Sequence, residues 1–219
     1  MKILALETST EILSLCCRAE SRLCELTRSM DLRHAEEVIP LTDWILSQAA
    51  VKARELDLVV VSGGPGSFTG LRIGMATAQG LAAGADCALV TVPSLDAYGY
   101  SACPDTVTLP LIDAKKKRFY AAFYRGGKRL SDYMDATPEE LLEKAAAYPK
   151  VLLCGPHAAL FRERLGQCAE LQNAVAEKFS LDPDAQAGKA AVLLRLGHEA
   201  FLRGEAPQGL FYLREPETT

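Results

Sequence analysis

Short apolar runs alternate with longer amphipathic segments along this chain of 219 residues. Three strand-like runs come first, "KILALET", "ILSLCCRA" and "RLCELTRS", and their hairpin-sized separations favour an antiparallel meander. A helical pattern over residues 34–50 follows, then the strand "LDLVVVS", a glycine-rich turn and a second helical pattern over 67–84. The strand "CALVTV" and a short helix in "PSLDAYGYSA" complete this half, which is predicted to be an α/β lobe with a mixed sheet.

The second half repeats the opening pattern in a shorter form. Strands are predicted in "TVTLPLIDA", "RFYAAFYRGG" and "KVLLCGP", and helices over 138–147, 157–168 and 188–203. Each half opens with a strand that ends in an acid and a turn, "LALETST" and "LPLIDAKKK". This weak internal repeat predicts two lobes of a duplicated fold, residues 1–102 and residues 103–219, with the hinge in "SACPDT" and a reduced second lobe.

Composition and charge are those of a soluble globular protein, with 49% hydrophobic and 24% charged residues. The net charge of −4 gives no basic footprint for nucleic acid over the whole chain, and "KKKR" at 115–118 is the local exception. The seven cysteines contain no Cys-x-x-Cys pair, so reduced structural thiols are expected rather than a zinc cluster or a disulfide framework. The apolar runs are too short for a signal peptide or a membrane span, so we expect a cytoplasmic protein.

The glycine turn lies in "SGGPGSFTGLRIG", residues 62–74, between a predicted strand and a predicted helix. Backbone N–H groups at such a place often hold phosphate. However, no lysine follows these glycines as the Walker pattern requires, and Gly70 lies one residue too far along for the dinucleotide fingerprint. The residues of the turn are Gly63, Gly64, Pro65, Gly66 and Ser67. The pattern gives little support to a phosphate site and makes Ser67 a candidate N-cap.

Both long helices of the first half are apolar over more of their circumference than packing on one side requires. The helix over 67–84 also contains four glycines, each costing roughly 1 kcal/mol relative to alanine, which indicates close approach of another backbone. In the helix over 34–50, Trp44 lies outside the apolar arc, as an interface anchor would. Periodicity alone leaves two explanations open: the second lobe covers these helices, or a partner does.

The sequence contains no recognisable catalytic constellation. His34, His157 and His198 form no His-x-x-x-His pair, so structural roles are favoured over metal binding. Glu7 and Asp113 end the first strands of the two halves, where paired acids facing a cleft hold Mg²⁺ in other proteins. The turns that follow them lack the glycine that lets a phosphate approach.

Several stretches together resemble the TsaB (YeaZ) family, whose members take part in threonylcarbamoyladenosine modification of bacterial tRNA. These stretches are "LALETST", "RHAEEVIPLTDWIL", "SGGPGSFTGLRIGMATAQGLA", "VPSLDA", "LPLIDAKKKRFYAAFY" and "FYLR". The resemblance covers most of residues 1–125 and the extreme C-terminus. It implies the actin-like ATPase fold (ASKHA, ribonuclease H-like), in two lobes with the second reduced.

The resemblance also implies a non-catalytic role. The family's catalytic partner and relative, TsaD, binds metal through a histidine pair, and Ser94 and Tyr98 stand at the corresponding positions here. Neither suits as a replacement ligand, so no intrinsic metal or cofactor is expected, and ATP, ADP and metal are expected in partner subunits. Glu7, Thr8 and Asp113 would then line a vestigial nucleotide cleft. A weak actin-like ATPase using these acids and the glycine turn is the enzyme alternative.

The family contact between TsaB and TsaD is a bundle formed by the first two helices of each N-terminal lobe. The partners implied are TsaD, then TsaE, with tRNA reached only through the complex and with no membrane. A homodimer that uses the same helices is expected in isolation, as a storage or competing state. The predicted interface residues are His34, Val38, Leu41, Trp44, Ile45, Gly70, Leu71, Arg72, Gly74, Met75 and Ala78.

Overall fold

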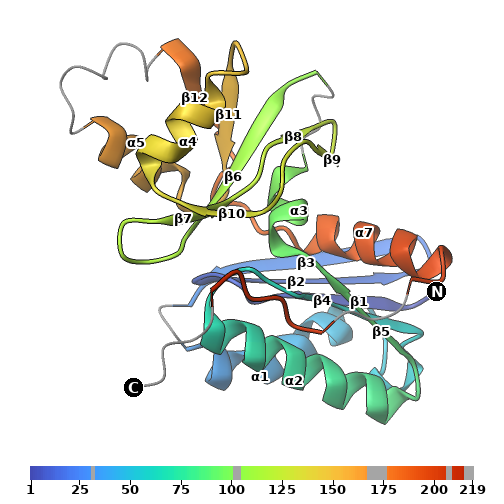
Figure 1. Ribbon diagram of the computed structural model, residues 1–219. Helices are drawn as coiled ribbons and strands as arrows, with labels where there is room; N and C mark the ends of the chain where they lie inside the picture. Colours follow the sequence, from blue (N-terminus) through green and yellow to red (C-terminus); the bar gives the residue numbers. More distant parts are fainter. Residues whose placement is uncertain (31–32, 101–104, 167–176, 206–208, 215–219) are drawn as a thin grey trace. The chain divides into compact units, whose positions relative to one another are not determined.

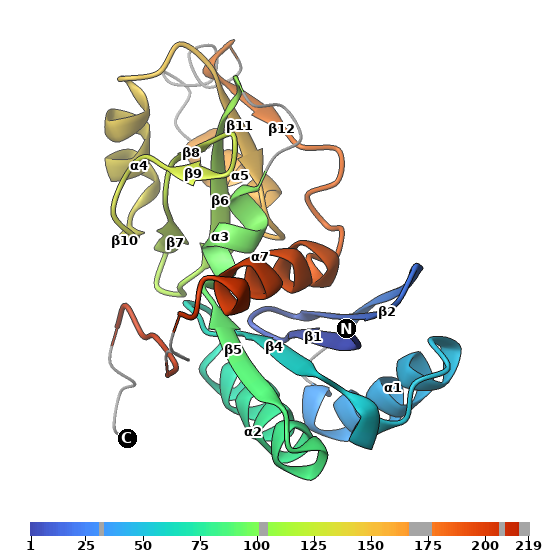
Figure 2. The ribbon, with the colours of Figure 1, turned by 90° about the vertical axis from the view of Figure 1, so that its right-hand side faces the viewer.

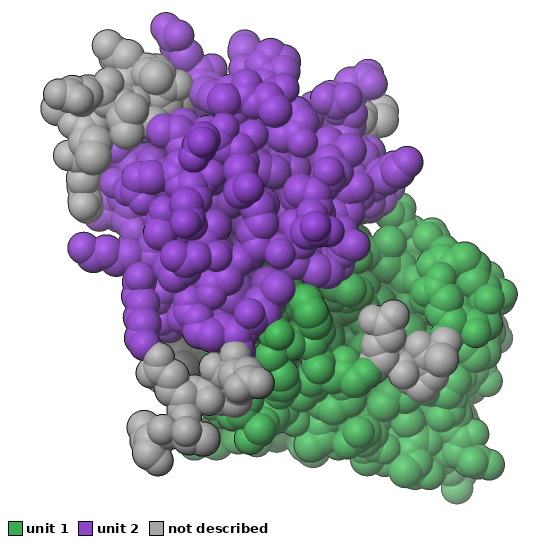
Figure 3. Space-filling view, in the orientation of Figure 1, with its two compact units in different colours: residues 1–97, 188–212 green, residues 98–187, 213–219 purple. Residues whose placement is uncertain are grey.

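The computed structural model describes residues 1–30, 33–100, 105–166, 177–205 and 209–214. The chain forms two compact units, coloured separately in Figure 3. Unit 1 comprises Met1–Ala97 and Gly188–Tyr212, and unit 2 comprises Tyr98–Ala187 and Leu213–Thr219. The predicted division into lobes 1–102 and 103–219 placed the last helix in the second lobe. That helix belongs to unit 1 instead. Most of the predicted hinge "SACPDT" lies outside the described residues.

Unit 1 is built on a five-stranded sheet in the order β3-β2-β1-β4-β5 (Figure 1). Its opening strands β1 (Ile3–Glu7), β2 (Ile12–Ala19) and β3 (Arg22–Ser29) form the predicted antiparallel meander. Strands β4 (Leu58–Ser62) and β5 (Ala88–Val92) then add in parallel, with Leu4 of β1 opposite Val59 of β4. The carboxyl ends of β1 and β4 therefore lie at the same edge, where the glycine turn begins.

Helices cover both faces of this sheet (Figure 2). The first layer contains α1 (His34–Gln48), the short 3₁₀ helix η1 (Ala53–Glu55) and α2 (Phe68–Ala85). The opposite face is covered by α7 (Ala190–Leu202), which contacts β1, β2, β4 and β5. The short helix α3 (Ser94–Gly99) follows β5.

The strand side chains of unit 1 alternate between two cores, as the two-residue period of a strand requires. Leu4 and Leu6 of β1 pack toward α1 and α2, whereas Ile3 and Ala5 pack toward α7. Strand β4 divides in the same way, and all five of its residues are buried. A sheet buried on both faces accounts for the continuous apolar run "LDLVVVS" in the sequence.

Unit 2 repeats the strand arrangement of unit 1 in its sheet order β10-β7-β6-β11-β12. The first strand, β6, pairs antiparallel with β7 and parallel with β11, as β1 pairs with β2 and β4. The predicted internal duplication is confirmed by this correspondence. The strands of unit 2 are β6 (Val107–Asp113), β7 (Phe119–Ala121), β8 (Tyr124–Arg125), β9 (Lys128–Arg129), β10 (Met134–Ala136), β11 (Val151–Cys154) and β12 (Phe179–Leu181).

Helices α4 (Pro138–Ala145) and α5 (Ala158–Gly166) also belong to unit 2. Its core is centred on Phe161 of α5, whose ring meets the rings of Phe119 and Phe179 edge-on at 5.4 and 5.7 Å. Helix α4 begins with a capping box, in which Thr137 and Glu140 exchange side-chain-to-backbone hydrogen bonds.

Candidate functional site

The glycine turn, residues 63–67, is fastened to its own unit through its backbone. The amide of Gly63 donates to Val92 O at 2.8 Å, and the amide of Ser67 donates to Ser9 O at 2.7 Å. Two amides that a phosphate grip would need are therefore bonded to carbonyls of the same chain. The predicted N-cap is confirmed, because Ser67 Oγ accepts a hydrogen bond of 3.2 Å from the amide of Gly70.

Three glycines in and after this turn make room for the turn between β1 and β2. A Cβ at Gly66 would meet Ser9, and one at Gly70 or Gly74 would meet Thr8. The predicted close approach of another backbone is thus confirmed for Gly70 alone among the four glycines of the helix, and that backbone belongs to the same unit and not to a partner. By contrast, a Cβ at Gly80 would have no neighbour within 4 Å. Gly80 and Gly84 in the second half of α2 therefore face open space rather than another part of the chain.

Most of the predicted interface residues are core residues of unit 1, which corrects that part of the prediction. The buried ones are His34, Val38, Ile45, Gly70, Leu71, Gly74 and Ala78. The apolar arcs of both helices are wide because each helix packs against the sheet and also against its neighbour. Leu41 and Met75 are half-buried at the edge of this core, and Arg72 and Trp44 are exposed.

Exposed apolar side chains remain on the outer side of α1. Ile39 is 56% exposed and Trp44 is 48% exposed, whereas Val38, Ile45 and Leu46 of the same helix are buried. Ile39 is not among the predicted interface residues, although it extends the apolar arc to which several of them belong. We call Ile39 and Trp44, together with Arg72, Ala76 and Gly80 on the exposed side of α2, the outer helix face.

The first acidic turn is buried and polar. Glu7 is fully buried and its Oε1 accepts a hydrogen bond of 2.8 Å from the amide of Ser9. The amide of Thr8 donates to Ser62 Oγ at 3.1 Å, while the hydroxyls of Thr8 and Ser9 are buried without a hydrogen-bond partner. Asp113 belongs to unit 2, so the predicted nucleotide cleft between Glu7 and Asp113 stays a prediction.

The two positions that stand in place of a histidine pair are inside the protein. Ser94 and Tyr98 are both buried, and the amide of Ser94 donates to Gly64 O at 2.7 Å. Burial lowers the pKa of His34, because desolvation disfavours the imidazolium form. Among the residues that the structure describes, no three His, Cys, Asp or Glu side chains gather where a metal ion could be held.

None of the helices in the described ranges is both long enough and apolar enough to cross a membrane.

Comparison with known proteins places the chain in a family. The family model described as TsaD, tRNA N6-adenosine threonylcarbamoyltransferase, matches residues 28–208. The chain belongs to this family. It is 33% identical over 102 residues to the tRNA threonylcarbamoyladenosine biosynthesis protein TsaB of Haemophilus influenzae, covering 47% of this chain and 43% of that protein. With the TsaB protein of Escherichia coli it shares 31% identity over 128 residues, covering 57% and 55%. The chain thus spans about half the length of these relatives.

Solved structures confirm the predicted fold. YeaZ from Pseudomonas aeruginosa superimposes with a TM-score of 0.71 at 25% identity, covering 93% of each chain. A Bacteroides thetaiotaomicron protein with an actin-like ATPase fold gives a TM-score of 0.52 at 11% identity, covering 89% of this chain and 95% of that one. The duplicated actin-like α/β fold and the resemblance to the TsaB (YeaZ) proteins are therefore both confirmed.

Proposed function

We propose that this chain is a non-catalytic subunit that binds TsaD and supports threonylcarbamoyl transfer to adenosine 37 of tRNAs that read ANN codons. The relatives from H. influenzae and E. coli are named as threonylcarbamoyladenosine biosynthesis proteins, which supports the pathway. TsaE is the further partner in this proposal, and the nucleotide and metal are held by the partner subunits.

The exposure of Trp44 on the outer helix face carries the proposal. A tryptophan with half its surface exposed is an effective interface anchor, because it buries a large area with little loss of side-chain entropy. Gly80 and Ala76 on α2 add no bulk, so a partner helix can approach the α2 backbone closely. The buried sides of α1 and α2 hold these residues in position, and the exposed sides of the two helices make the contact with TsaD.

The positions of Ser94 and Tyr98 support a non-catalytic role. TsaD uses a histidine pair there to bind metal, whereas a buried serine and a buried tyrosine offer no comparable ligands. Two amides of the glycine turn are also bonded to the protein's own carbonyls, which leaves fewer donors for a phosphate.

Sedimentation velocity tests the proposal, using this chain alone and then mixed with TsaD from the same organism, with and without Mg-ATP. We expect a heterodimer boundary for the wild type. Trp44→Asp and Gly80→Trp change the outer helix face without entering the core, and each is expected to raise the Kd by about 10-fold or more. Gly74→Trp is unsuitable, because position 74 faces Thr8 inside the unit.

Leu202→Asp is the matched control. Leu202 is 68% exposed and lies on α7, which covers the opposite face of the same sheet, so this variant should bind TsaD like the wild type. Absence of a complex under every nucleotide condition would overturn the proposal. Micromolar binding of Mg-ATP to the chain alone would favour the weak ATPase instead. A homodimer lost in the Trp44 and Gly80 variants would assign the same surface to self-association.

A further inference from the structure

Two cysteines lie directly opposite each other on the β2–β3 hairpin. In the antiparallel register of these strands, Cys17 of β2 pairs with Cys24 of β3. Residues that face each other across such a pair project to the same side of the sheet. Cys17 belongs to the core on the α1 and α2 side, and Cys24 packs against that core. Both thiols are free, so the hairpin brings two free thiols to one place in unit 1.

The spacing of such a cross-strand pair suits a disulfide bond. Directly opposed residues of an antiparallel pair have Cα atoms about 4.5 or about 5.5 Å apart, and a disulfide requires about 4.4–6.8 Å. The Cβ atoms of such a pair are about 4.5–5.5 Å apart, whereas the bond needs about 3.5–4.5 Å, so a small local approach of the strands is required. A bond that forms under this slight strain is readily reduced again.

The other cysteines that the structure describes are placed differently. Cys16 is next to Cys17 in the chain, but its side chain belongs to the opposite core, on the α7 side of the sheet. Cys87 precedes β5, and strands β1 and β4 separate β5 from β2 in the sheet order. Cys154 belongs to unit 2. Among the described cysteines, the strand register therefore singles out Cys17 and Cys24.

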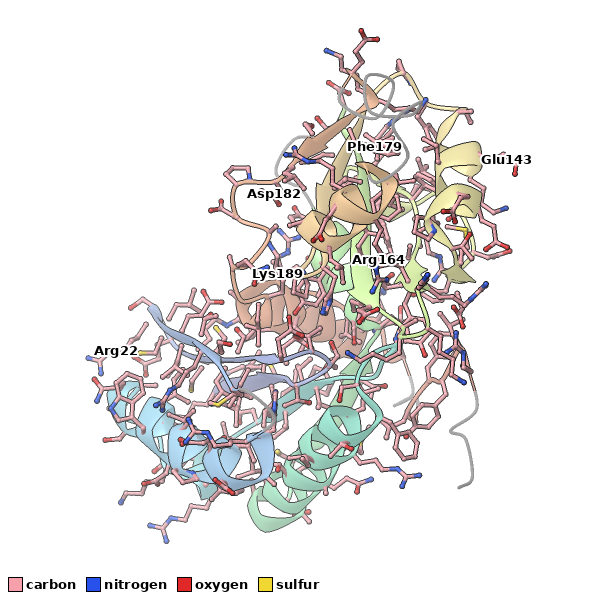
Figure 4. All side chains as sticks on the ribbon, turned by 90° about the vertical axis from the view of Figure 1, so that its left-hand side faces the viewer. Arg22, Glu143, Arg164, Phe179, Asp182 and Lys189 are labelled. Atoms are coloured by element: carbon pink, nitrogen blue, oxygen red, sulfur yellow. The ribbon has the colours of Figure 1, made fainter. Side chains whose placement is uncertain are left out.

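Strand β3 stands at the end of the sheet order, next to β2. Its first residue, Arg22, is labelled in Figure 4 at the tip of the hairpin. All residues of β3 except Cys24 and Leu26 are exposed. An edge strand with so few buried side chains opens locally at a low cost in free energy. A covalent bond from Cys24 to Cys17 would oppose this opening by holding β3 against β2.

We propose that Cys17 and Cys24 form a reversible disulfide when the protein meets hydrogen peroxide, and that this bond fastens β3 to β2. Cys24 reacts first, since it is half-buried whereas Cys17 is fully buried. Its thiolate attacks a peroxide oxygen and breaks the O–O bond, which gives a sulfenic acid, and the hydroxide that leaves takes up the Cys24 proton as water. The sulfur of Cys17 then attacks the Cys24 sulfur and breaks its S–OH bond, and that hydroxide takes up the Cys17 proton. Two thiols and one peroxide thus give one disulfide and two waters.

The second step depends on the proximity of Cys17 to Cys24. Burial raises the pKa of Cys17 to about 11, and Cys24 acts in the same direction, so little Cys17 thiolate is present at neutral pH. A neighbouring sulfenic acid offsets this, because two groups held side by side react at a high effective concentration. Glutathione reverses the reaction by thiol–disulfide exchange, in which two glutathione thiols become one glutathione disulfide. The cysteine pair lies within unit 1 and is independent of the proposed function.

Peptide mapping of the full chain tests the proposal after treatment with hydrogen peroxide in native buffer. The remaining thiols are alkylated under denaturing conditions, and trypsin then places the two cysteines in separate peptides, residues 3–18 and 23–28. We expect a joined peptide that is lighter than the sum of its parts by two hydrogen atoms and that disappears after treatment with reduced glutathione. Amide hydrogen exchange of residues 22–29 should be several-fold slower in the oxidised protein than in the reduced protein.

Cys17→Ala and Cys16→Ala are the matched variants, because both side chains are fully buried and adjacent on β2. Cys17→Ala should lose the joined peptide and the slower exchange, whereas Cys16→Ala should keep both. Fragmentation of the joined wild-type peptide locates the bond without any variant, and a bond at Cys16 would overturn the inference. So would a joined peptide that forms only in urea, or its absence at a peroxide concentration that oxidises Cys87. Unchanged exchange of residues 22–29 in the oxidised protein would overturn the fastening of β3.

Discussion

A Cβ at Gly70 of α2 would overlap the carbonyl oxygen of Thr8 in the turn between β1 and β2. Since that oxygen belongs to the backbone, it cannot rotate away as the end of a flexible side chain would. The first turn of α2 therefore packs directly against the β1–β2 turn because residue 70 has no side chain. The buried hydroxyls of Thr8 and Ser9 lie in the same region.

Gly70→Ala should destabilise the protein by about 1–3 kcal/mol, because the added methyl group overpacks a site that has no room for it. Gly80→Ala is the matched substitution in the same helix, and its methyl group would enter open space. That variant should gain up to about 1 kcal/mol from helix propensity. Urea midpoints of the two variants measure both effects. Equal midpoints would contradict the assignment of Gly70 to a tight contact.

Ser67→Ala should lower stability by about 1 kcal/mol, because it removes the side chain that caps α2 and leaves the amide of Gly70 without that acceptor. Ser67→Asp should retain wild-type stability, since its carboxylate accepts the same hydrogen bond and favours the positive end of the helix dipole. Thermal unfolding followed by circular dichroism compares the three proteins. The assignment of Ser67 as the N-cap fails if the alanine variant unfolds at the same temperature as the wild type.

Stability should fall as the pH drops below neutrality. Burial lowers the pKa of His34 from 6.5, and burial together with Arg18 lowers that of His198. The unfolded chain then binds protons near pH 6.5 that the folded chain binds only at lower pH, so the stabilisation is complete above about 6.5 and is lost below it. We expect the urea midpoint to drop between about pH 7.5 and about pH 5.5.

The variant His34→Leu tests how much the buried histidine contributes to the pH dependence of stability, apart from the other titrating groups. Its urea midpoint should drop less over the same pH interval, because the unfolded variant has one fewer proton to gain. A drop as large as that of the wild type would show that His34 does not contribute to the pH dependence.

The adjacent free cysteines of β2, Cys16 and Cys17, should be unreactive toward alkylating reagents in the folded protein. Burial raises the pKa of Cys16 to about 12 and that of Cys17 to about 11, so almost no thiolate forms near pH 8. Mass spectrometry of alkylated peptides should find Cys87, which is partly exposed, labelled well before either residue. Addition of urea should remove the difference. Rapid labelling of Cys16 in native buffer would contradict its burial.

Local patterns in the sequence determined most of the secondary structure. The helices predicted over 34–50 and 67–84 are observed as His34–Gln48 and Phe68–Ala85. Periodicity and the cap at Ser67 suffice here, because hydrogen bonding within a helix depends on neighbours in the sequence. The duplicated plan of the two units was also predictable, since each half opens with the same strand, acid and turn.

Tertiary structure decided which surfaces meet. The amphipathic pattern of α7 shows that the helix buries one face, but any apolar sheet face of suitable size satisfies that pattern, and the sheet of unit 1 is the one it covers. In the same way, the apolar arc of α1 shows how much of the helix is covered and not what covers it. Val38 and Ile45 are buried by the chain itself, and Ile39 and Trp44 are left exposed.

The left-handed backbone at Lys115, Lys116 and Lys117 has no signal in the sequence either, because lysine has no preference for that region. The sequence by itself determined the elements, their order and their duplication, since these follow from interactions between residues close along the chain. The buried arcs, the exposed Trp44 and the conformation of the lysine turn depended on segments far apart in sequence, whose packing no local pattern encodes.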